Sequence, residues 1–446
     1  MPNITVPPLV EDLLKAETPR QAAAAIKLTL AIDLFRNNRP VVTDAIWEKS
    51  VKMISTSPTA PTITVASTTG YARMVRWDGT LAPPTANNQP LNAGTAISGP
   101  YNTRLPKLVL VYSCDLAGQL VGEITQLSIM SSGVTELDLS AISATSLTHL
   151  TVYDNFLTSL DVSRFTNLVL LVLDTNKLTE IDVSANVLLT TLTLSNNLLT
   201  KLDVRANVLL YSFSVTNNRL TELDVRYNTL LNYLGASLNQ LQGINLSANT
   251  NLGSLALQNN QLNALSLITN TQLVALYFGD NNLTSIDLSN NASIEWLSCP
   301  RNNLTEFICP VDSSLIELYV EDNALTSLDT NGAHSLEVLH ASDNELTQIN
   351  LDTNTLLSVL FVEANFLNSL SLAQNPQLTR ILCSSNRFTS ATHDAFYNSF
   401  ASELESIGGT CDSGGQLGNV TAASAARRTA LVTAPGIWTL NTTATA

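Results

Sequence analysis

The residue types that most often do chemistry are few in this chain and are poorly grouped. The four histidines are His149, His334, His340 and His393, and none has a cysteine, aspartate or glutamate at the spacing of a metal site. No GxSxG, phosphate-loop or HExxH motif occurs. We therefore expect no metal and no cofactor, and we predict that the protein is not an enzyme.

A glycine-rich stretch near the C-terminus, GGTCDSGG at residues 408–415, could suggest a phosphate-binding loop or a cysteine nucleophile. A phosphate-binding loop should follow an apolar strand, and none precedes this stretch. A nucleophilic cysteine needs a base, and Cys411 has no histidine close to it in the sequence. We interpret the stretch as a plain loop.

Aspartates recur at multiples of 21 residues, which raises the question of a calcium site. Carboxylates stacked ~4.8 Å apart repel one another, and calcium could relieve that repulsion. The alternative is that each carboxylate is solvated or accepts a hydrogen bond within its turn. Calcium-binding repeats carry GGxGxD-type spacing, which is absent here, so we favour the alternative. The column comprises Asp161, Asp182, Asp203, Asp224, Asp287 and Asp329, and Asp138 precedes it outside this spacing.

The aspartates belong to a 21-residue repeat that organises most of the chain. Written in lines of 21 from Leu147, the sequence reads LTHLTVYDNFLTSLDVSRFTN, then LVLLVLDTNKLTEIDVSANVL, and continues without a gap to Gln377. We number the positions of each line as places one to twenty-one. Asparagine stands at place nine of every line and once more beyond: Asn155, Asn176, Asn197, Asn218, Asn239, Asn260, Asn281, Asn302, Asn323, Asn344, Asn365 and Asn386.

The spacing within a line predicts its local structure. Leu-x-Leu at places four and six predicts a short strand with both residues pointing inward. The asparagine amide can both donate and accept, so it can satisfy backbone groups inside the bend that follows. Leu-Asp-Val at places fourteen to sixteen predicts a second strand on the opposite side. With strands on both sides, we expect a mainly β, nearly straight solenoid of about twelve coils.

The pattern LxxLxLxxNxLTxLDVSxNx resembles the leucine-rich repeat family in its short, 21-residue form, known from bacterial and phage proteins. The resemblance covers about three-fifths of the chain and is specific, since the asparagine register never breaks. A looser copy, ITQLSIMSSGVTELDLS, starts at Ile124. The resemblance implies a solenoid fold but no particular ligand.

The segments outside the repeats predict three further parts. Thr18-Pro19-Arg20-Gln21 is a capping box that opens a helix, and the linker STSPTAPT follows a second possible helix ending near Ile54. TITVAS, YARMVRW and KLVLVYSCD predict strands. The C-terminal end alternates helical and strand-like stretches. We expect a helical attachment segment at 1–55, a β-rich N-terminal cap at 56–123, the solenoid at 124–389 and a mixed helix and strand C-terminal cap at 390–446.

The outward places of the first strand, places three, five and seven, change along the chain. They are mostly serine and threonine in early lines, and become aromatic later, with carboxylates alongside. Exposed aromatics beside carboxylates on a rigid sheet suit a protein- or glycan-binding face. The alternative is that aromatics simply favour strands. Because adjacent coils are ~4.8 Å apart, we expect Tyr277, Trp296 and Tyr319 to form one continuous patch. The predicted binding face comprises Tyr233, Tyr277, Trp296, Glu317, Tyr319, His340 and Phe361.

Composition limits the class of protein. Charged residues are 13% of the chain, about half the usual ~25%, and the net charge is −15. These values exclude a basic nucleic-acid binder, and no apolar run is long enough for a transmembrane helix. Cys299, Cys309 and Cys383 occupy core places, so we expect buried thiols and no disulfide framework.

Two functional hypotheses follow. The first is a virion-associated protein of a phage tail, fibre or capsid decoration. It would be made in the host cytoplasm without a signal peptide and would contact other virion proteins through residues 1–55. The second is an intracellular or secreted leucine-rich repeat scaffold or effector that binds a partner protein, and without a virion the chain is expected in the cytoplasm.

Overall fold

The chain of 446 residues divides into two units, residues 1–210 and 211–446, in a computed structural model. Strand backbone is described for the early part of the chain, and side chains are described from residue 123 onward. The described residues are 51–55, 62–67, 71–75, 85–86, 90–91, 107–114, 123–130, 133–140, 142–310, 313–400, 404, 408–416, 418–433 and 438–442.

The predicted helix after Thr18 lies outside the described residues, as does most of the expected attachment segment. Its expected end is wrong, because Val51–Ser55 is a strand, β1, and not the end of a helix. Strand β1 pairs with later strands of the N-terminal cap, so the boundary drawn at residue 55 must lie before Val51.

The first unit opens with a set of short antiparallel strands. Three cap strands after β1 lie where the alternating runs predict them: β2 (Thr62–Ser67), β3 (Tyr71–Val75) and β6 (Lys107–Cys114). Two short strands between them, β4 (Thr85–Ala86) and β5 (Pro90–Leu91), were not predicted. The first repeat copy follows as β7 (Ile124–Met130) and β8 (Val134–Asp138). Strand β2 pairs antiparallel with β7, and β1 with β8. Both strand edges of the first coil are thereby covered, which removes two open templates for aggregation.

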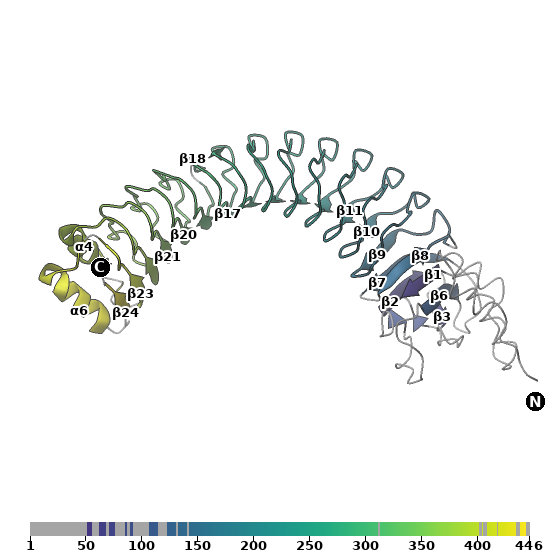
Figure 1. Cartoon of the computed structure of the whole chain (residues 1–446), viewed down its shortest axis with the longest axis horizontal. Coiled ribbons are helices and arrows are strands. Elements are labelled where there is room, and N and C mark those ends of the chain that lie inside the picture. The colour runs from purple at the N-terminus through teal and green to yellow at the C-terminus, as the bar shows by residue number, and fades with distance from the viewer. Residues whose placement is uncertain are drawn as a thin grey trace, which may run out of the picture. The chain divides into compact units, whose positions relative to one another are not determined.

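Parallel strands then stack one per coil. In the first unit, β7 pairs with β9 (His149–Tyr153), which is followed by β10 (Leu170–Val172) and β11 (Thr191–Thr193), as Figure 1 shows. Paired residues on neighbouring strands are 21 positions apart in the sequence, so Leu150 pairs with Leu171, and Leu171 with Leu192. Equivalent places therefore lie next to one another in successive coils.

The second unit has the same parallel pattern of one strand per coil in its described residues. Its coil strands are β12 (Ser212–Ser214), β13 (Tyr233–Gly235), β14 (Ser254–Ala256), β15 (Ala275–Tyr277), β17 (Trp296–Ser298), β19 (Glu317–Tyr319), β20 (Val338–His340), β21 (Val359–Phe361) and β22 (Arg380–Leu382). They pair in this order.

The core of each coil is a ring of aliphatic side chains. In the coil that starts at Leu252, the inward places are taken by Leu252, Leu255, Leu257, Leu262 and Leu267, all at most 1% exposed. Burying a leucine contributes ~1.5–3 kcal/mol, which does not offset the entropy of ordering 21 residues in one coil. Stacking of neighbouring coils must supply the rest, as in other repeat proteins.

The asparagines at place nine form a ladder of side-chain to backbone hydrogen bonds. The Oδ1 atom of Asn260 accepts from the Leu241 N–H at 3.0 Å, and its Nδ2 donates to the carbonyls of Ala236 and Leu257, both at 3.0 Å. Leu241 and Ala236 belong to the preceding coil. Each ladder asparagine therefore joins two coils and closes the bend after the strand, which is the role that the sequence predicts.

The residue before each ladder asparagine has left-handed backbone. All twelve residues at place eight have φ between 51° and 57°, and they include a threonine, a leucine and an arginine: Asp154, Thr175, Asn196, Asn217, Leu238, Asn259, Asp280, Arg301, Asp322, Asp343, Ala364 and Ser385. This conformation is unfavourable for side chains other than glycine, asparagine and aspartate. The hydrogen bonds of the ladder impose it regardless of residue type.

The second strand of the coil is less general than the sequence predicts. A paired second strand forms at β8, at the parallel pair β16 (Ser285–Asp287) and β18 (Glu306–Ile308), and as one bridge between Asp329 and Asn350. The other described coils carry extended segments and turns at these places. The expectation of a nearly straight solenoid rested on second strands in every coil, so it loses its premise.

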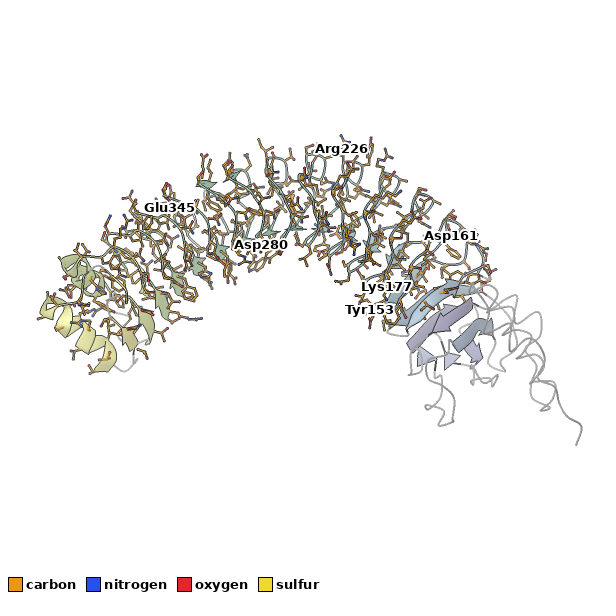
Figure 2. All side chains as sticks on the ribbon, viewed as in Figure 1. Tyr153, Asp161, Lys177, Arg226, Asp280 and Glu345 are labelled. Carbon is orange, nitrogen blue, oxygen red and sulfur yellow. The ribbon has the colours of Figure 1, made fainter. Side chains whose placement is uncertain are left out.

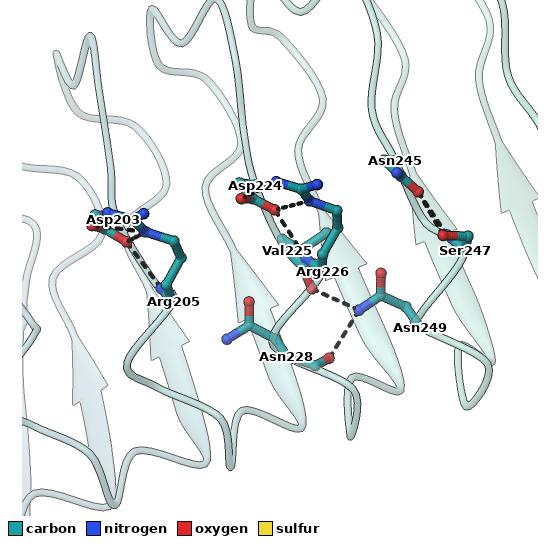
Figure 3. Close-up of polar contacts among 9 residues, drawn as sticks. All are labelled: Asp203, Arg205, Asp224, Val225, Arg226, Asn228, Asn245, Ser247 and Asn249. Carbon is teal, nitrogen blue, oxygen red and sulfur yellow. Dashed lines mark hydrogen bonds and ion pairs between the residues drawn. The ribbon is translucent and has the colours of Figure 1, made fainter.

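A second asparagine column, at place nineteen, joins successive coils at the turn after this segment, with or without a paired second strand. Nδ2 of Asn249 donates to the carbonyls of Val225 and Asn228 in the preceding coil, both at 2.9 Å (Figure 3). Asn270 and Asn291 repeat this pair of bonds. The Oδ1 atoms of Asn249, Asn270 and Asn291 are buried without a hydrogen bond, so this column is less completely satisfied than the ladder.

The C-terminal cap combines helices with two more coil strands. It contains α4 (Ser390–Asn398), β23 (Gly409–Asp412), η1 (Ala422–Ser424), α6 (Ala425–Thr433) and β24 (Trp438–Asn441). The interpretation of GGTCDSGG as a plain loop is therefore wrong, since β23 lies within it and pairs with β22 and β24. Gly409 is required there, because a Cβ atom would lie 2.0 Å from the Thr379 carbonyl oxygen.

The cap also contains a further member of the ladder. Oε1 of Gln416 accepts from the Phe388 N–H at 3.3 Å, and its Nε2 donates to the Cys383 carbonyl at 2.6 Å. These are the bonds that an asparagine at place nine makes. Gln416 thus extends the ladder one coil beyond Asn386, after the insertion of α4.

The cysteines of the core are free thiols. Cys299 and Cys383 are fully buried, whereas Cys309 is partly exposed. Burial raises the pKa of Cys309 to about 12, so its reactive thiolate form is scarce at neutral pH. Cys299 and Cys383 act as small apolar side chains of the core.

Candidate functional site on the strand face

The strand face consists of the outward side chains at places three, five and seven of the coil strands. The strands β15, β19, β20 and β21 each bury the middle one of their three residues and turn the first and third toward solvent. All the aromatic residues that the sequence assigns to this face point outward, and the best exposed are Trp296 at 38% and Tyr233 at 37%. The binding role of the face itself remains a prediction.

Three of these residues form a continuous row of rings in the second unit. Tyr319, His340 and Phe361 face one another at place five of successive strands. The ring centroids are 6.0 Å apart between Tyr319 and His340 and 5.0 Å apart between His340 and Phe361, both edge to face. Arg380, which is not among the residues predicted for the face, lies over the Phe361 ring, 4.9 Å from its centroid. Its position at place three, an outward place of the strand, could have assigned it to this face.

The row is shorter at one end than the expected patch of Tyr277, Trp296 and Tyr319. Ser298 stands between Tyr277 and Tyr319 at place five. Trp296 stands at place three, where its neighbour in the next coil is Glu317. The expectation of one continuous aromatic patch is therefore wrong at Tyr277. Glu317 lies beside Trp296 in the strand register and accepts a hydrogen bond from the Tyr319 hydroxyl.

Tyr233 is separate from this group. A Cβ atom on Gly235 would lie 2.7 Å from the Tyr233 hydroxyl oxygen and 3.0 Å from that of Ser214, so the ring lies across the glycine. The places around it carry serine, glycine and alanine. The candidate site therefore comprises the coils from Trp296 to Arg380.

Carboxylates lie between the rings and set the electrostatics. The Tyr319 hydroxyl donates to Oε2 of Glu317 at 3.1 Å. Nδ1 of His340 lies 3.3 Å from Oε2 of Glu321. Burial alone would lower the pKa of His340, but the hydrogen bond to Glu321 and the charges of Glu321 and Glu363 outweigh burial and raise it. Burial raises the pKa of Glu363. Glu317 was assigned to the face from sequence.

The aspartate column on the opposite side of the coils has a structural role. In each case Oδ1 accepts from the backbone N–H two residues later, as in Asp203 to Arg205 and Asp224 to Arg226 (Figure 3). Hydrogen bonds from the side chain and backbone of Arg205 lower the pKa of Asp203 to about 2. Asn245 makes the same bond to Ser247, so a charge is not required. Figure 2 shows Arg226 on the outer turns and Asp280 toward the strand side.

Two other kinds of site, a metal site and a histidine-activated nucleophile, were sought outside the strand face. The described residues contain no group of three or more histidine, cysteine, aspartate or glutamate side chains that could hold a metal. In the C-terminal cap, Nε2 of His393 lies 2.8 Å from Oγ of Ser413, and Nδ1 lies 2.9 Å from the Gly418 carbonyl. Ser413 and His393 are at most 1% exposed, so no substrate can reach the pair. It holds the cap together.

Comparisons with known proteins find similarity only among solved structures. Family models and curated proteins give no match. Among solved structures, the functional domain of InlJ from Listeria monocytogenes is 28% identical, with a TM-score of 0.56, over 72% of this chain and 75% of that one. This match agrees with the unbroken 21-residue register from Leu147 to Gln377 and with the asparagine ladder of the described coils. The protein is a leucine-rich repeat protein.

Two further matches show the fold of this leucine-rich repeat protein. Internalin InlF from Listeria monocytogenes is 22% identical, with a TM-score of 0.53, over 69% of this chain and 86% of that one. A leucine-rich repeat protein from Leptospira interrogans is 21% identical, with a TM-score of 0.51, over 66% and 84%. The InlJ domain includes a cysteine ladder. Here the ladder is made of asparagines.

The described helices of the leucine-rich repeat protein are short. None is long and apolar enough to cross a membrane.

Proposed function

We propose that this leucine-rich repeat protein binds a partner protein through the strand face between Trp296 and Arg380, as a non-enzymatic adhesin or scaffold. The carrying observation is the row of Tyr319, His340 and Phe361, which is held by parallel strands and bordered by Glu317 and Glu321. Rigid aromatic side chains lose little entropy on binding and dominate many protein interfaces.

The experiment is a selection from a displayed random peptide library against the full chain. Selected peptides are then tested against the double variant Trp296→Ser/Tyr319→Ser. We expect peptides that bind the natural chain and lose affinity for the double variant, while the urea unfolding curve stays the same because neither side chain enters the core. Peptides that bind both chains equally would contradict a contact surface in these coils.

A glycan array with the same two chains tests the alternative partner for this face. Aromatic rings beside carboxylates also suit sugars, and glycan binding lost in the double variant would favour that partner.

The sequence hypothesis of a virion-associated protein concerns where this binding is used. Its support is the composition, in which only 13% of residues are charged. The alternative is an intracellular or secreted scaffold or effector with the same strand face. Mass spectrometry of purified phage particles distinguishes them: peptides of this chain in the particles support the first, and their absence supports the second.

A further inference from the structure

Glu317 is an oriented carboxylate that lies beside an exposed indole ring. The Tyr319 hydroxyl donates to one oxygen of this carboxylate, which fixes its orientation. Trp296 is the neighbour of Glu317 on the adjacent strand, and strands lie ~4.8 Å apart, so the indole and the carboxylate stand side by side. Trp296 remains 38% exposed. An oriented carboxylate beside an open indole presents an acceptor and an aromatic surface together.

The charge around this point is one-sided. Glu317, Glu321 and Glu363 lie on the strand face, and Glu295 and Glu337 immediately precede strands β17 and β20. Within the described part of the chain, these five carboxylates have a single ion-pair partner, His340, which lies beside Glu321. The nearby Arg301 is already paired with Asp280 at 2.6 Å. Negative charge therefore accumulates around Glu317, where the described residues place no paired cation.

The chain itself shows which groups complement this kind of surface. The Arg380 guanidinium covers the Phe361 ring, and His340 covers Glu321 while its ring contacts Tyr319 and Phe361. A guanidinium and an imidazole thus occupy the aromatic and acidic positions at the C-terminal end of the row. At Trp296 and Glu317 the described residues provide no equivalent cation.

We propose that the partner inserts an arginine-bearing, positively charged segment at Trp296 and Glu317, with the guanidinium stacked on the indole and hydrogen-bonded to the carboxylate. Arginine suits this position because its planar group can stack on a ring and donate to a carboxylate at the same time. Glu295, Glu321, Glu337 and Glu363 attract the rest of the basic segment. The inference rests on the proposed function of the face as a protein-binding surface.

The test uses the peptides selected from the random library. We expect the peptides that depend on Trp296 and Tyr319 to be enriched in arginine. Their affinity should fall roughly tenfold in Glu317→Gln, since a charge-assisted hydrogen bond becomes a neutral one. Their affinity should also fall with rising salt. The matched control is Glu306→Gln, which removes the same charge from β18 on the opposite side of the coil and should leave affinity unchanged.

The outcomes separate the two ideas. Peptides that depend on Trp296 and Tyr319 but lack basic residues, or bind Glu317→Gln as well as the natural chain, would overturn the arginine proposal and leave a protein-binding face intact. Basic peptides that weaken equally in Glu317→Gln and Glu306→Gln would reduce the effect to net charge and would also overturn it. Selected peptides that ignore Trp296 and Tyr319 would contradict the proposed function itself.

Discussion

Place nine and place five of the same coils differ in what a side chain must satisfy. At place nine, Asn260 holds one backbone N–H and two principal carbonyls of two coils in the buried interior. At place five, Tyr277, Ser298, Tyr319, His340 and Phe361 follow one another and contact only their neighbours and solvent. The repeated place is fixed by backbone hydrogen bonding, and the variable place is free to acquire a binding function.

The two asparagine columns give the largest test of this difference. Asn260→Leu leaves the buried Leu241 N–H without its acceptor and removes one of the two amide donors to each of the Ala236 and Leu257 carbonyls, so it should lower the free energy of unfolding by roughly 1–3 kcal/mol. Asn270→Leu in the second column removes two donors to carbonyls that keep a backbone N–H partner, together with an oxygen that already lacks a hydrogen bond, so we expect a loss of roughly 0.5–1.5 kcal/mol. Urea unfolding of both variants measures the two values. Equal losses would contradict the greater role of the ladder.

Two histidines contrast the strand face with the C-terminal cap. The raised pKa of His340 means that its stabilising contribution is fully present below the unfolded value of ~6.5 and is lost as pH rises through the folded pKa. Burial lowers the pKa of His393, despite the hydrogen bond from Nδ1 to the Gly418 carbonyl. Its contribution is present above ~6.5 and is lost as pH falls through the folded pKa.

Urea midpoints measured from acid to alkaline pH should therefore separate two variants. The difference between the natural chain and His340→Gln should shrink as pH rises, and the difference from His393→Asn should shrink as pH falls. Parallel curves for either variant would mean that its histidine does not change protonation between the folded and unfolded states.

Place eight should give the smallest effect, because its side chain is variable but its backbone is not. Thr175 is β-branched and has a φ of 56°, whereas Asn196 has the same conformation at 57°. Thr175→Asn should raise the free energy of unfolding by about 1 kcal/mol, since asparagine tolerates left-handed backbone. The reverse change, Asn196→Thr, should lower it by a similar amount. Urea unfolding without these opposite signs would show that the side chain at place eight does not determine the strain.

The sequence predicts most of the solenoid because one period fixes the strand, the bend and the core together. The ladder role of Gln416 was not predicted, because α4 lengthens the interval between Asn386 and Gln416 beyond 21 residues and because glutamine replaces asparagine. Strand β23 was missed because its glycines resemble a loop, although Gly409 is required by close approach to Thr379. The second strands were overpredicted, since Leu-Asp-Val alternation does not reveal that the carboxylate caps a turn.

The candidate site was predictable only in part for a related reason. Alternation showed that Trp296, Tyr319 and Phe361 point outward, but it could not show which rings touch. The hydrogen bond from Tyr319 to Glu317 and the position of Arg380 over Phe361 depend on side-chain conformation and not on place. Arg380 also sits on the last strand before the cap, where the regular pattern of the repeats ends.

The most direct test of a separable binding face is the affinity of the Trp296→Ser/Tyr319→Ser double variant for peptides selected against the natural chain. We predict a loss of at least roughly tenfold with the urea midpoint unchanged, since aromatic anchors of an interface commonly contribute this much. Full affinity in a folded double variant would contradict the account.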